Sequence, residues 1–309
     1  MTAVYDDLAA VPAGRRSLAL GSFDGVHLGH RRVIESTMAA AREQGLTSTV
    51  VTFHPHPMAV LRPELSPHEL STLHRRTQLV SEIGPDELVV LRFTPEFSQI
   101  DAERFAAEIL AEHLGARRVN VGANFRYGHR AQGTVSTLTE AGQRLGFVVA
   151  VAPLLELHGA PVSSSRIRAL IGEGDVAGAG LLLGRPAWLE GTVVRGDGRG
   201  RDLGFPTANL EPAPRSAMPA RGIYAGRAHL ESGSYVAAIS VGYNPTFTNS
   251  RNLIRVEAHL LDFGRDIYGR HLLLEFNDRL RDEQRFGSVE DLIAQLHQDV
   301  HRTRELVRR

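Results

Sequence analysis

The regular alternation of short apolar runs with helical patterns over the first 180 or so residues most constrains the fold of this chain. The apolar runs are residues 17–23, 47–53, 87–93, 117–122 and 146–153, and the helical patterns are residues 30–45, 68–83, 101–115 and about 135–145. Strands that alternate with helices are typical of a parallel, doubly wound sheet. The sequence therefore predicts an α/β domain whose ligands bind outside the carboxyl ends of its strands.

The pattern changes after the segment LLLGRPAWLEG, residues 181–191. The strand-like runs that follow are residues 190–196, 222–230, 235–242, 254–261 and 271–276, with turn residues between them. Such spacing is typical of a small antiparallel barrel or sandwich. A helical pattern closes the chain at residues 288–306, after a Ser-x-x-Asp capping pattern. We expect two domains, residues 1–184 with the doubly wound parallel sheet and residues 185–309 with a small antiparallel β-barrel and a terminal helix.

The composition excludes several classes of function. All 35 basic residues are arginine, so a Walker P-loop, a protein-kinase ATP site and Schiff-base chemistry are excluded, because each requires a lysine. There is no cysteine, which excludes disulfides and thiolate metal sites. Acidic residues also number 35, so no overall charge favours nucleic acid or a membrane surface. No run approaches the roughly 20 apolar residues of a membrane span, and the N-terminus lacks the apolar core of a secretory signal. We expect a cytoplasmic protein without nucleic-acid or membrane partners.

The stretch GSFDGVHLGH, residues 21–30, follows the first predicted strand and leads into a helix. Its glycines allow a ligand to approach the backbone closely, and a helix N-terminus favours anions. His27 and His30 could both stabilise charge that develops on a phosphate. A metal site is the alternative, but helical ligand pairs are normally four residues apart with an acidic third ligand. The pattern favours phosphate.

This stretch resembles the HxGH signature of the nucleotidyltransferase superfamily, in the form found in bacterial FMN adenylyltransferases. Three later segments resemble the same family in order: VTFHPHP (51–57), VGANFRYGHRAQGT (121–134) and VSSSRIRALIGEGDVAGAGLLLGRP (162–186). His54 stands where the family usually has an acid, so no role is transferred to that position.

The resemblance implies that the FMN phosphate attacks the α-phosphorus of ATP and releases pyrophosphate. It implies catalytic roles for His27 and His30. It further implies ATP or phosphate contacts for Gly21, Phe23, Asp24, Gly29, Ser164, Ser165 and Arg168, and a flavin-side position for Asn124 and Arg126. The alternative for residues 163–165 is an ordinary helix cap, which is compatible with phosphate binding.

The most unusual stretch of the second half is EGTVVRGDGRGRDLGFPTANL, residues 190–210. Glycine turns can expose amides to phosphate, and Thr207 and Asn209 offer oxygen ligands suited to Mg²⁺. The alternative is a barrel hairpin with a long glycine-rich loop. In IRVEAHLL, residues 254–261, the period-two pattern places Glu257 opposite the apolar face, where it could act as a general base. The alternative for Glu257 is a solvated strand position paired with Arg255.

These stretches closely resemble the riboflavin kinase signature, and GIYAGRA, AISVGYNPTF and VEAHLLDFGRDIYGR follow in the family's order. The resemblance implies that Glu257 is the general base for the 5′-hydroxyl of the ribityl chain. It implies ATP or phosphate contacts for Gly196, Gly200, Arg201, Gly204 and Pro206, and metal contacts for Thr207 and Asn209. NPTFTNS, residues 244–250, departs mildly from the pattern, which has a glycine or an acid nearer Phe247.

Together the two halves resemble the bifunctional bacterial riboflavin kinase/FMN adenylyltransferases, also called FAD synthetases. The resemblance implies an FMN adenylyltransferase domain at residues 1–184 and a riboflavin kinase domain at residues 185–309. It implies riboflavin, FMN, FAD and ATP as substrates and products, and Mg²⁺ with ATP as cofactor. A homo-oligomer is compatible with the sequence. The alternatives are an enzyme with one active half beside a scaffold, and a flavin carrier or RNA-binding module; zero net charge speaks against RNA.

Overall fold

The computed structural model describes residues 1–196, 198–243 and 254–307, and its contacts divide the chain into two units. The first unit is Met1–Pro67 with Ser71–Ser163, and the second is His68–Leu70 with Ser164–Arg309. Helices α6 (Ser164–Glu173) and α7 (Val176–Leu183) therefore belong to the second unit by contacts, although the expected domain boundary follows residue 184. The reason is that Val176 of α7 is buried in the apolar core of the barrel.

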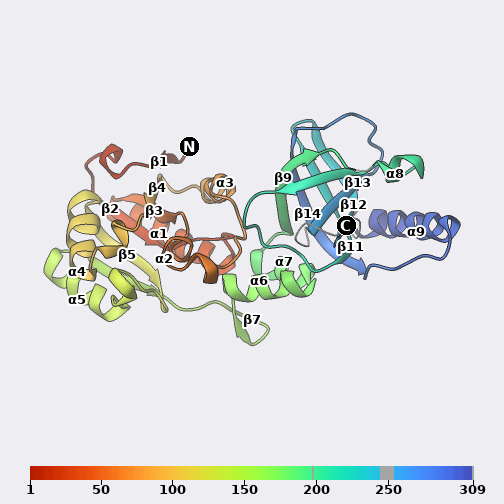
Figure 1. Cartoon of the computed structure of the whole chain (residues 1–309). Helices are drawn as coiled ribbons and strands as arrows, with labels where there is room; N and C mark the ends of the chain where they lie inside the picture. Colours follow the sequence, from red (N-terminus) through yellow and green to blue (C-terminus); the bar gives the residue numbers. More distant parts are fainter. Residues whose placement is uncertain (197, 244–253, 308–309) are drawn as a thin grey trace. The chain divides into compact units, whose positions relative to one another are not determined.

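The first unit contains a parallel sheet in the order β1-β4-β3-β2-β5-β6 (Figure 1). Its strands are β1 (Ala3–Tyr5), β2 (Arg16–Leu20), β3 (Thr47–His54), β4 (Glu87–Arg92), β5 (Ala116–Gly122) and β6 (Val148–Ala152). Every neighbouring pair is parallel, which confirms the predicted doubly wound sheet. The strand order reverses between β2 and β5, so the crevice at their carboxyl ends is the expected place for a ligand. The short edge strand β1 was not predicted.

The helices of the first unit connect these strands. They are α1 (Leu28–Gln44), α2 (Pro57–Leu61), α3 (Leu73–Ile83), α4 (Ala102–Arg104), its π-helical continuation η4 (Phe105–His113) and α5 (Val135–Leu145). A short hairpin of β7 (Glu156–Leu157) and β8 (Ala160–Pro161) precedes α6. The expectation of a helix from residue 68 was wrong, because Thr72 caps α3: its hydroxyl accepts a hydrogen bond from the Arg75 amide at 3.1 Å.

A buried ion pair joins three strands at the amino edge of this sheet. Arg16 at the start of β2 donates through Nε to Glu87 Oε2 at 2.7 Å and through Nη2 to Glu87 Oε1 at 3.2 Å. The Thr49 hydroxyl of β3 donates to the same carboxylate at 2.7 Å. Arg16 also donates to the carbonyls of Pro12 and Leu114. Because the charges are paired and hydrogen-bonded on every side, the desolvation cost of burying them is offset.

The second unit is built around a closed antiparallel barrel in the order β10-β13-β12-β11-β14-β9. Its strands are β9 (Ala187–Val194), β10 (Ala208–Pro212), β11 (Gly222–Leu230), β12 (Gly233–Tyr243), β13 (Ile254–Leu260) and β14 (His271–Arg281). The short helix α8 (Arg199–Asp202) lies between β9 and β10, and α9 (Val289–Val307) ends the described chain. The predicted barrel with a terminal helix is confirmed; β10, which carries the ANL segment, was not predicted as a strand.

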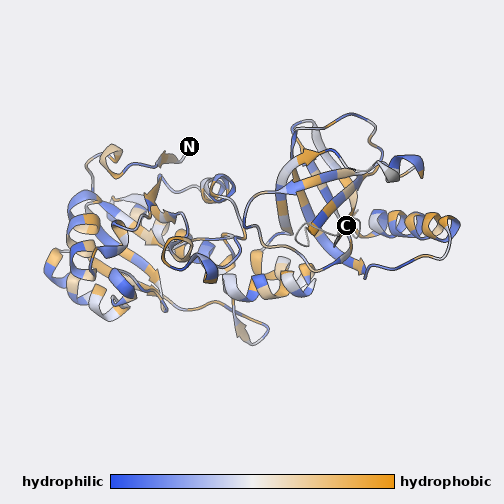
Figure 2. Cartoon of the chain, in the orientation of Figure 1, coloured by the Kyte–Doolittle hydropathy of each residue, from blue (hydrophilic) through white to orange (hydrophobic). Residues whose placement is uncertain are grey.

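Side chains alternate along β13 from Arg255 to Leu260, whereas Ile254 at the start of the strand is exposed. Val256, Ala258 and Leu260 are buried in the barrel core, whereas Arg255, Glu257 and His259 are only partly buried on the outer face. This is the division that the period-two pattern predicts. α9 shows apolar and polar residues alternating along its length (Figure 2) and packs against β11, β12 and β14. α9 therefore covers part of the outer face of the barrel, over β11, β12 and β14.

We expect Glu87→Gln to lower the free energy of unfolding of the first unit by about 3–5 kcal/mol, because it leaves the buried Arg16 guanidinium without its counter-charge. Calorimetry of the full chain measures the change. Glu35→Gln is the matched control, since the Arg31–Glu35 pair is exposed and its loss should cost less than about 1 kcal/mol. Equal effects of the two substitutions would contradict the structural role of the buried pair.

Candidate active sites

The turn after β2 has a strained backbone that buried side chains hold in place. Phe23, Gly25 and Val26 have positive φ angles of 48°, 77° and 37°. Such values are costly for residues other than glycine and persist only where neighbouring groups hold them. The Asp24 carboxylate, 1% exposed, accepts a hydrogen bond from the Ser71 amide at 3.1 Å, and the Gly25 amide donates to the Ser71 hydroxyl at 3.1 Å. Asp24 and Ser71 thus hold the turn in place.

The turn places two histidines at the N-terminus of α1, a helix of 17 residues. Nδ1 of His27 accepts a hydrogen bond from the His30 amide at 3.2 Å and so caps the helix. The two imidazole rings stack with their centroids 3.5 Å apart, and the edge of Phe23 contacts His30 with centroids at 5.2 Å. Paired imidazoles at the positive end of a helix are suited to binding and stabilising a phosphate.

Asn124 and Arg126 lie in the loop that follows β5, the strand next to β2 across the reversal of strand order. Both side chains are exposed. Because β2 and β5 are parallel neighbours, this loop leaves the sheet at the same edge as the histidine turn. The structure therefore brings the predicted flavin-side residues and the histidine pair to one edge of the first unit.

His54 ends β3 at the same edge, and its carbonyl accepts a hydrogen bond from the Phe93 amide at 2.9 Å. Burial, and secondly the positive charge of Arg76, lower the pKa of His54 below its usual value. Arg76 on α3 is itself buried and donates to the Phe53 carbonyl at 3.3 Å. The position that usually carries an acid in the resembling family thus holds an imidazole whose protonation is disfavoured by burial and by Arg76. No sequence motif pointed to Arg76 or to Ser71.

The lowered pKa of His54 predicts a pH dependence of stability for the first unit. The unfolded chain takes up a proton on His54 as the pH falls through about 6.5, whereas the folded chain resists it, so the free energy of unfolding decreases toward acid. We expect His54→Gln to reduce the loss of melting temperature between neutral and mildly acidic pH, measured by calorimetry on the full chain. Identical pH slopes for the two proteins would contradict this role of His54.

Three of the residues that are predicted to contact phosphate belong to the second unit. α6 begins at Ser164 and carries Ser165 and Arg168 in its first turns. Arg168 Nε donates to the His68 carbonyl at 2.6 Å, within the same unit. That these residues face His27 and His30 across a triphosphate stays a prediction.

In the second unit, one arginine connects the predicted base with a predicted metal ligand. Arg255 Nε lies 2.7 Å from Glu257 Oε1 and 2.9 Å from Asn209 Oδ1. Asn209 and Glu257 are directly opposed on the paired strands β10 and β13, and the Thr207 hydroxyl lies 3.5 Å from Glu257 Oε2. The pairing of Glu257 with Arg255, which the sequence left open as an alternative, is therefore present together with the predicted cluster.

Two glycines of the loop between β9 and β10 are required by close contacts. A Cβ atom on Gly196 would lie 2.2 Å from Asn209 Nδ2, and one on Gly200 would lie 2.4 Å from the Phe205 carbonyl oxygen. Gly204 has a φ of 84°, which favours glycine. The backbone of this loop thus packs directly against the segment that carries Thr207 and Asn209. Asp197 and the NPTFTNS segment, including Phe247, lie outside the described residues.

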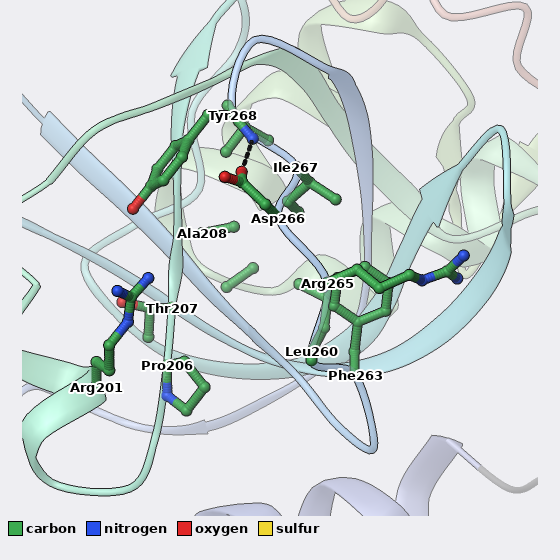
Figure 3. A pocket seen from close by; sticks show the side chains of 13 residues that line it. Arg201, Pro206, Thr207, Ala208, Leu260, Phe263, Arg265, Asp266, Ile267 and Tyr268 are labelled. Carbon is green, nitrogen blue, oxygen red and sulfur yellow. Dashed lines mark hydrogen bonds between the residues drawn. The ribbon is translucent and has the colours of Figure 1, made fainter.

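Two cavities of the second unit share Thr207 as a lining residue. The first, of about 360 Å³, lies at the barrel mouth and is shown in Figure 3; Arg201, Pro206, Phe263 and Tyr268 help to line it. The second, of about 300 Å³, lies between the outer face of the barrel and α9 and includes Glu257. Thr207 therefore lies between the cavity that Arg201 lines and the cavity that Glu257 lines.

Comparison with known proteins identifies both units. A family model for FAD synthetase matches residues 12–166, and one for riboflavin kinase matches residues 183–307. Bifunctional riboflavin kinase/FMN adenylyltransferases of Bacillus subtilis and Escherichia coli K12 are 35% and 33% identical to this chain. The alignments cover 91% of this chain and 89% of the Bacillus protein, and 97% of this chain and 95% of the Escherichia protein.

This chain belongs to the bifunctional riboflavin kinase/FMN adenylyltransferase family. Its second half phosphorylates riboflavin to FMN with ATP, and its first half transfers the adenylyl group of ATP to FMN, which gives FAD and pyrophosphate. A crystal structure from Streptococcus pneumoniae, described as a macrolide-efflux protein, has the same fold with a TM-score of 0.85 and 32% identity over 98% of both chains.

The close approach of Gly196 to Asn209 predicts a defect in the kinase reaction alone. We expect Gly196→Ala to displace the Asn209 side chain and lower kcat/KM for ATP in FMN formation by roughly 10-fold or more. FAD formation from supplied FMN should be unchanged. The control is Gly287→Ala, because a Cβ atom there meets nothing within 4 Å. A kinase rate that Gly196→Ala leaves intact would mean that the position of Asn209 does not matter for the reaction.

Proposed function

We propose that His27 and His30 bind the ATP phosphates in the adenylyl transfer and stabilise the charge that develops on them. The stacked pair at the N-terminus of α1 is the observation that supports this role. The FMN phosphate oxygen attacks the α-phosphorus, the bond to the bridging oxygen breaks, and pyrophosphate leaves. Such a transfer depends on positioning and charge stabilisation, which imidazoles, backbone amides and arginine supply in a chain without lysine. Gly21 and Gly29 flank the turn, and a contact of Ser164, Ser165 and Arg168 with the ATP phosphates stays a prediction.

Phe23 and Asp24 contribute to this site indirectly in our proposal. Both residues are 1% exposed, so neither presents its side chain to a ligand. Asp24 holds the strained turn through Ser71, and Phe23 supports the ring of His30. We propose this positioning role for their side chains, and the phosphate contacts predicted for them from the sequence stay a prediction. Asn124 and Arg126 remain on the flavin side, where their exposed side chains can contact FMN.

For the kinase we place ATP in the cavity at the barrel mouth and riboflavin in the cavity under α9. The first cavity has Arg201 and Pro206 from the glycine loop on its wall, whereas the second has apolar walls suited to a ring system together with Glu257. Glu257 accepts the proton of the ribityl 5′-hydroxyl as its oxygen attacks the γ-phosphorus, and ADP leaves. The transferred group then passes beside Thr207, which lines both cavities.

The residues at this boundary fit a magnesium ion bound with ATP. Thr207 and Asn209 offer neutral oxygen ligands, and Mg²⁺ is commonly held by few protein ligands together with substrate phosphates. Among the described residues there is no cluster of three or more histidine, cysteine, aspartate or glutamate side chains that could hold a metal independently of substrate. When bound, Mg²⁺ would neutralise phosphate charge; Arg255 keeps Asn209 beside Glu257.

Riboflavin, FMN, FAD and ATP are the substrates and products of the family, and we propose them as the small-molecule partners of this chain, without nucleic acid or a membrane. Within the part of the chain that the structure describes, no helix is both long and apolar enough to cross a bilayer. The cytoplasmic location and a homo-oligomer stay predictions.

The assignment of separate sites predicts that His30→Ala reduces FAD formation by at least about 100-fold and leaves FMN formation intact, because only the first unit loses a phosphate contact. Chromatography of the flavins formed from riboflavin and Mg-ATP measures both products. His74→Ala, an exposed histidine on α3, is the matched control. Loss of both reactions in a folded His30 variant would contradict separate sites.

Removal of the base should give the opposite result. We expect Glu257→Gln to lower kcat for FMN formation by about 100-fold or more, since the proposed general base is removed, while FAD still forms from supplied FMN. The same assay distinguishes a bifunctional enzyme from a chain with one inactive half. If the wild-type protein accumulates FMN without FAD, the first unit is inactive.

A further inference from the structure

The cavity that we assign to riboflavin exists because a helix covers the outside of the barrel. Its barrel wall consists mainly of side chains that point away from the core, such as Ile223, Ala238 and Ser240. The opposite wall is α9, which contributes Leu292, Leu296, Asp299 and Val300. The width of the cavity is therefore set by how α9 is held above the strands.

α9 is attached to the barrel through its second half. Its buried residues are Asp299, Thr303 and Val307, and the residues before Asp299 are exposed or only partly buried. The first half nevertheless supplies Leu292 and Leu296 to the cavity. This first half contacts the loop before β10 through His297, whose ring lies edge-on to Phe205 with centroids 5.0 Å apart. The position of the wall further depends on the polar attachment that follows at Asp299.

That attachment is the ion pair between Arg281 and Asp299. Arg281, the last residue of β14, donates through Nε to Oδ1 at 3.0 Å and through Nη2 to Oδ2 at 2.6 Å. Gln295 Nε2, one helical turn earlier, donates to the same carboxylate at 3.0 Å. The two charged side chains are 15% and 6% exposed, and both residues line the cavity. A bidentate contact of this kind fixes direction as well as distance.

A second ion pair on the same helix provides a natural comparison. Arg304 of α9 donates through Nη1 and Nη2 to the two carboxylate oxygens of Asp262 at 2.7 and 2.8 Å. The side chains are 35% and 73% exposed, and neither residue lines the flavin cavity. The helix therefore carries one pair at the cavity and one pair away from it.

We propose that the Arg281–Asp299 pair shapes the riboflavin site: it holds α9 at the distance from the barrel strands that forms the flavin cavity. The proposal rests on the placement of riboflavin in this cavity. A wall that is already in place when the substrate arrives spares the cost of ordering it on binding, so the pair acts on affinity for riboflavin. Glu257 lies on β13 and Thr207 directly precedes β10, so strands of the barrel carry the groups of the chemical step, and α9 contacts this segment through the rings of His297 and Phe205.

The test is the kinetics of FMN formation by full-length Asp299→Asn, with Asp262→Asn as the matched control. For Asp299→Asn we expect KM for riboflavin to rise by about 10-fold, while kcat and KM for ATP stay within about 2-fold. For Asp262→Asn all three values should stay within about 2-fold. Hydrogen exchange of the peptide over residues 288–300 should increase without ligand in Asp299→Asn and not in Asp262→Asn.

Two further variants cover the cases in which Asp299→Asn does not fold or riboflavin binds elsewhere. Arg281→Lys retains the charge but loses the bidentate fork, so it should raise KM for riboflavin in the same direction and replaces Asp299→Asn if that variant does not fold. Ala238→Phe places a ring into the cavity and tests the placement of riboflavin itself. If Ala238→Phe leaves KM for riboflavin unchanged, the placement is wrong and the proposal falls with it. If Ala238→Phe raises KM but the ion-pair variants do not, or if they lower kcat and both affinities equally, the positioning role is overturned.

Discussion

The buried pair of Arg16 and Glu87 is the interaction on which the first unit depends. It ties β2 to β4, and Thr49 of β3 donates to the same carboxylate, so three adjacent parallel strands are held in register at their amino ends. A parallel sheet with helices on its faces buries its strands, which leaves the strand ends as the place for chemistry. With the amino ends occupied by this network, the carboxyl ends are free to carry the histidine turn and the loop of Asn124.

A different constraint operates in the second unit. A closed barrel fills its interior with alternate side chains, and the others must point outward. On β13 this places Glu257 outside, directly opposite Asn209 on β10. This outward carboxylate shares a cavity with residues of α9 and of the loop before β10. The base is thus positioned by strand register, while the space for its substrate is made by a helix that follows in the sequence.

The two main candidate features could be identified from the sequence because each is local. The histidine pair of GSFDGVHLGH lies within ten residues, and the alternation that exposes Glu257 lies within one strand. The strands β1 and β10 were not predicted. β1 has only three residues at the edge of the sheet, and β10 follows a glycine-rich loop, so neither shows enough of the hydrophobic pattern of a strand. Direct ligand contacts of Phe23 and Asp24, which belong to the motif, stay a prediction; what the structure adds is that both residues are buried.

The sequence by itself determined the two fold types, the family, and the candidates for base and phosphate binding, since these depend on patterns between neighbouring residues. Only the tertiary structure decided which partners these residues have. Asp24 meets Ser71 through the packing of the segment before α3, Arg255 joins Glu257 to Asn209 through barrel register, and Arg281 meets Asp299 through the docking of α9. Such pairs join residues far apart in the chain, and their contact depends on sheet order, register and helix packing, which no local pattern encodes.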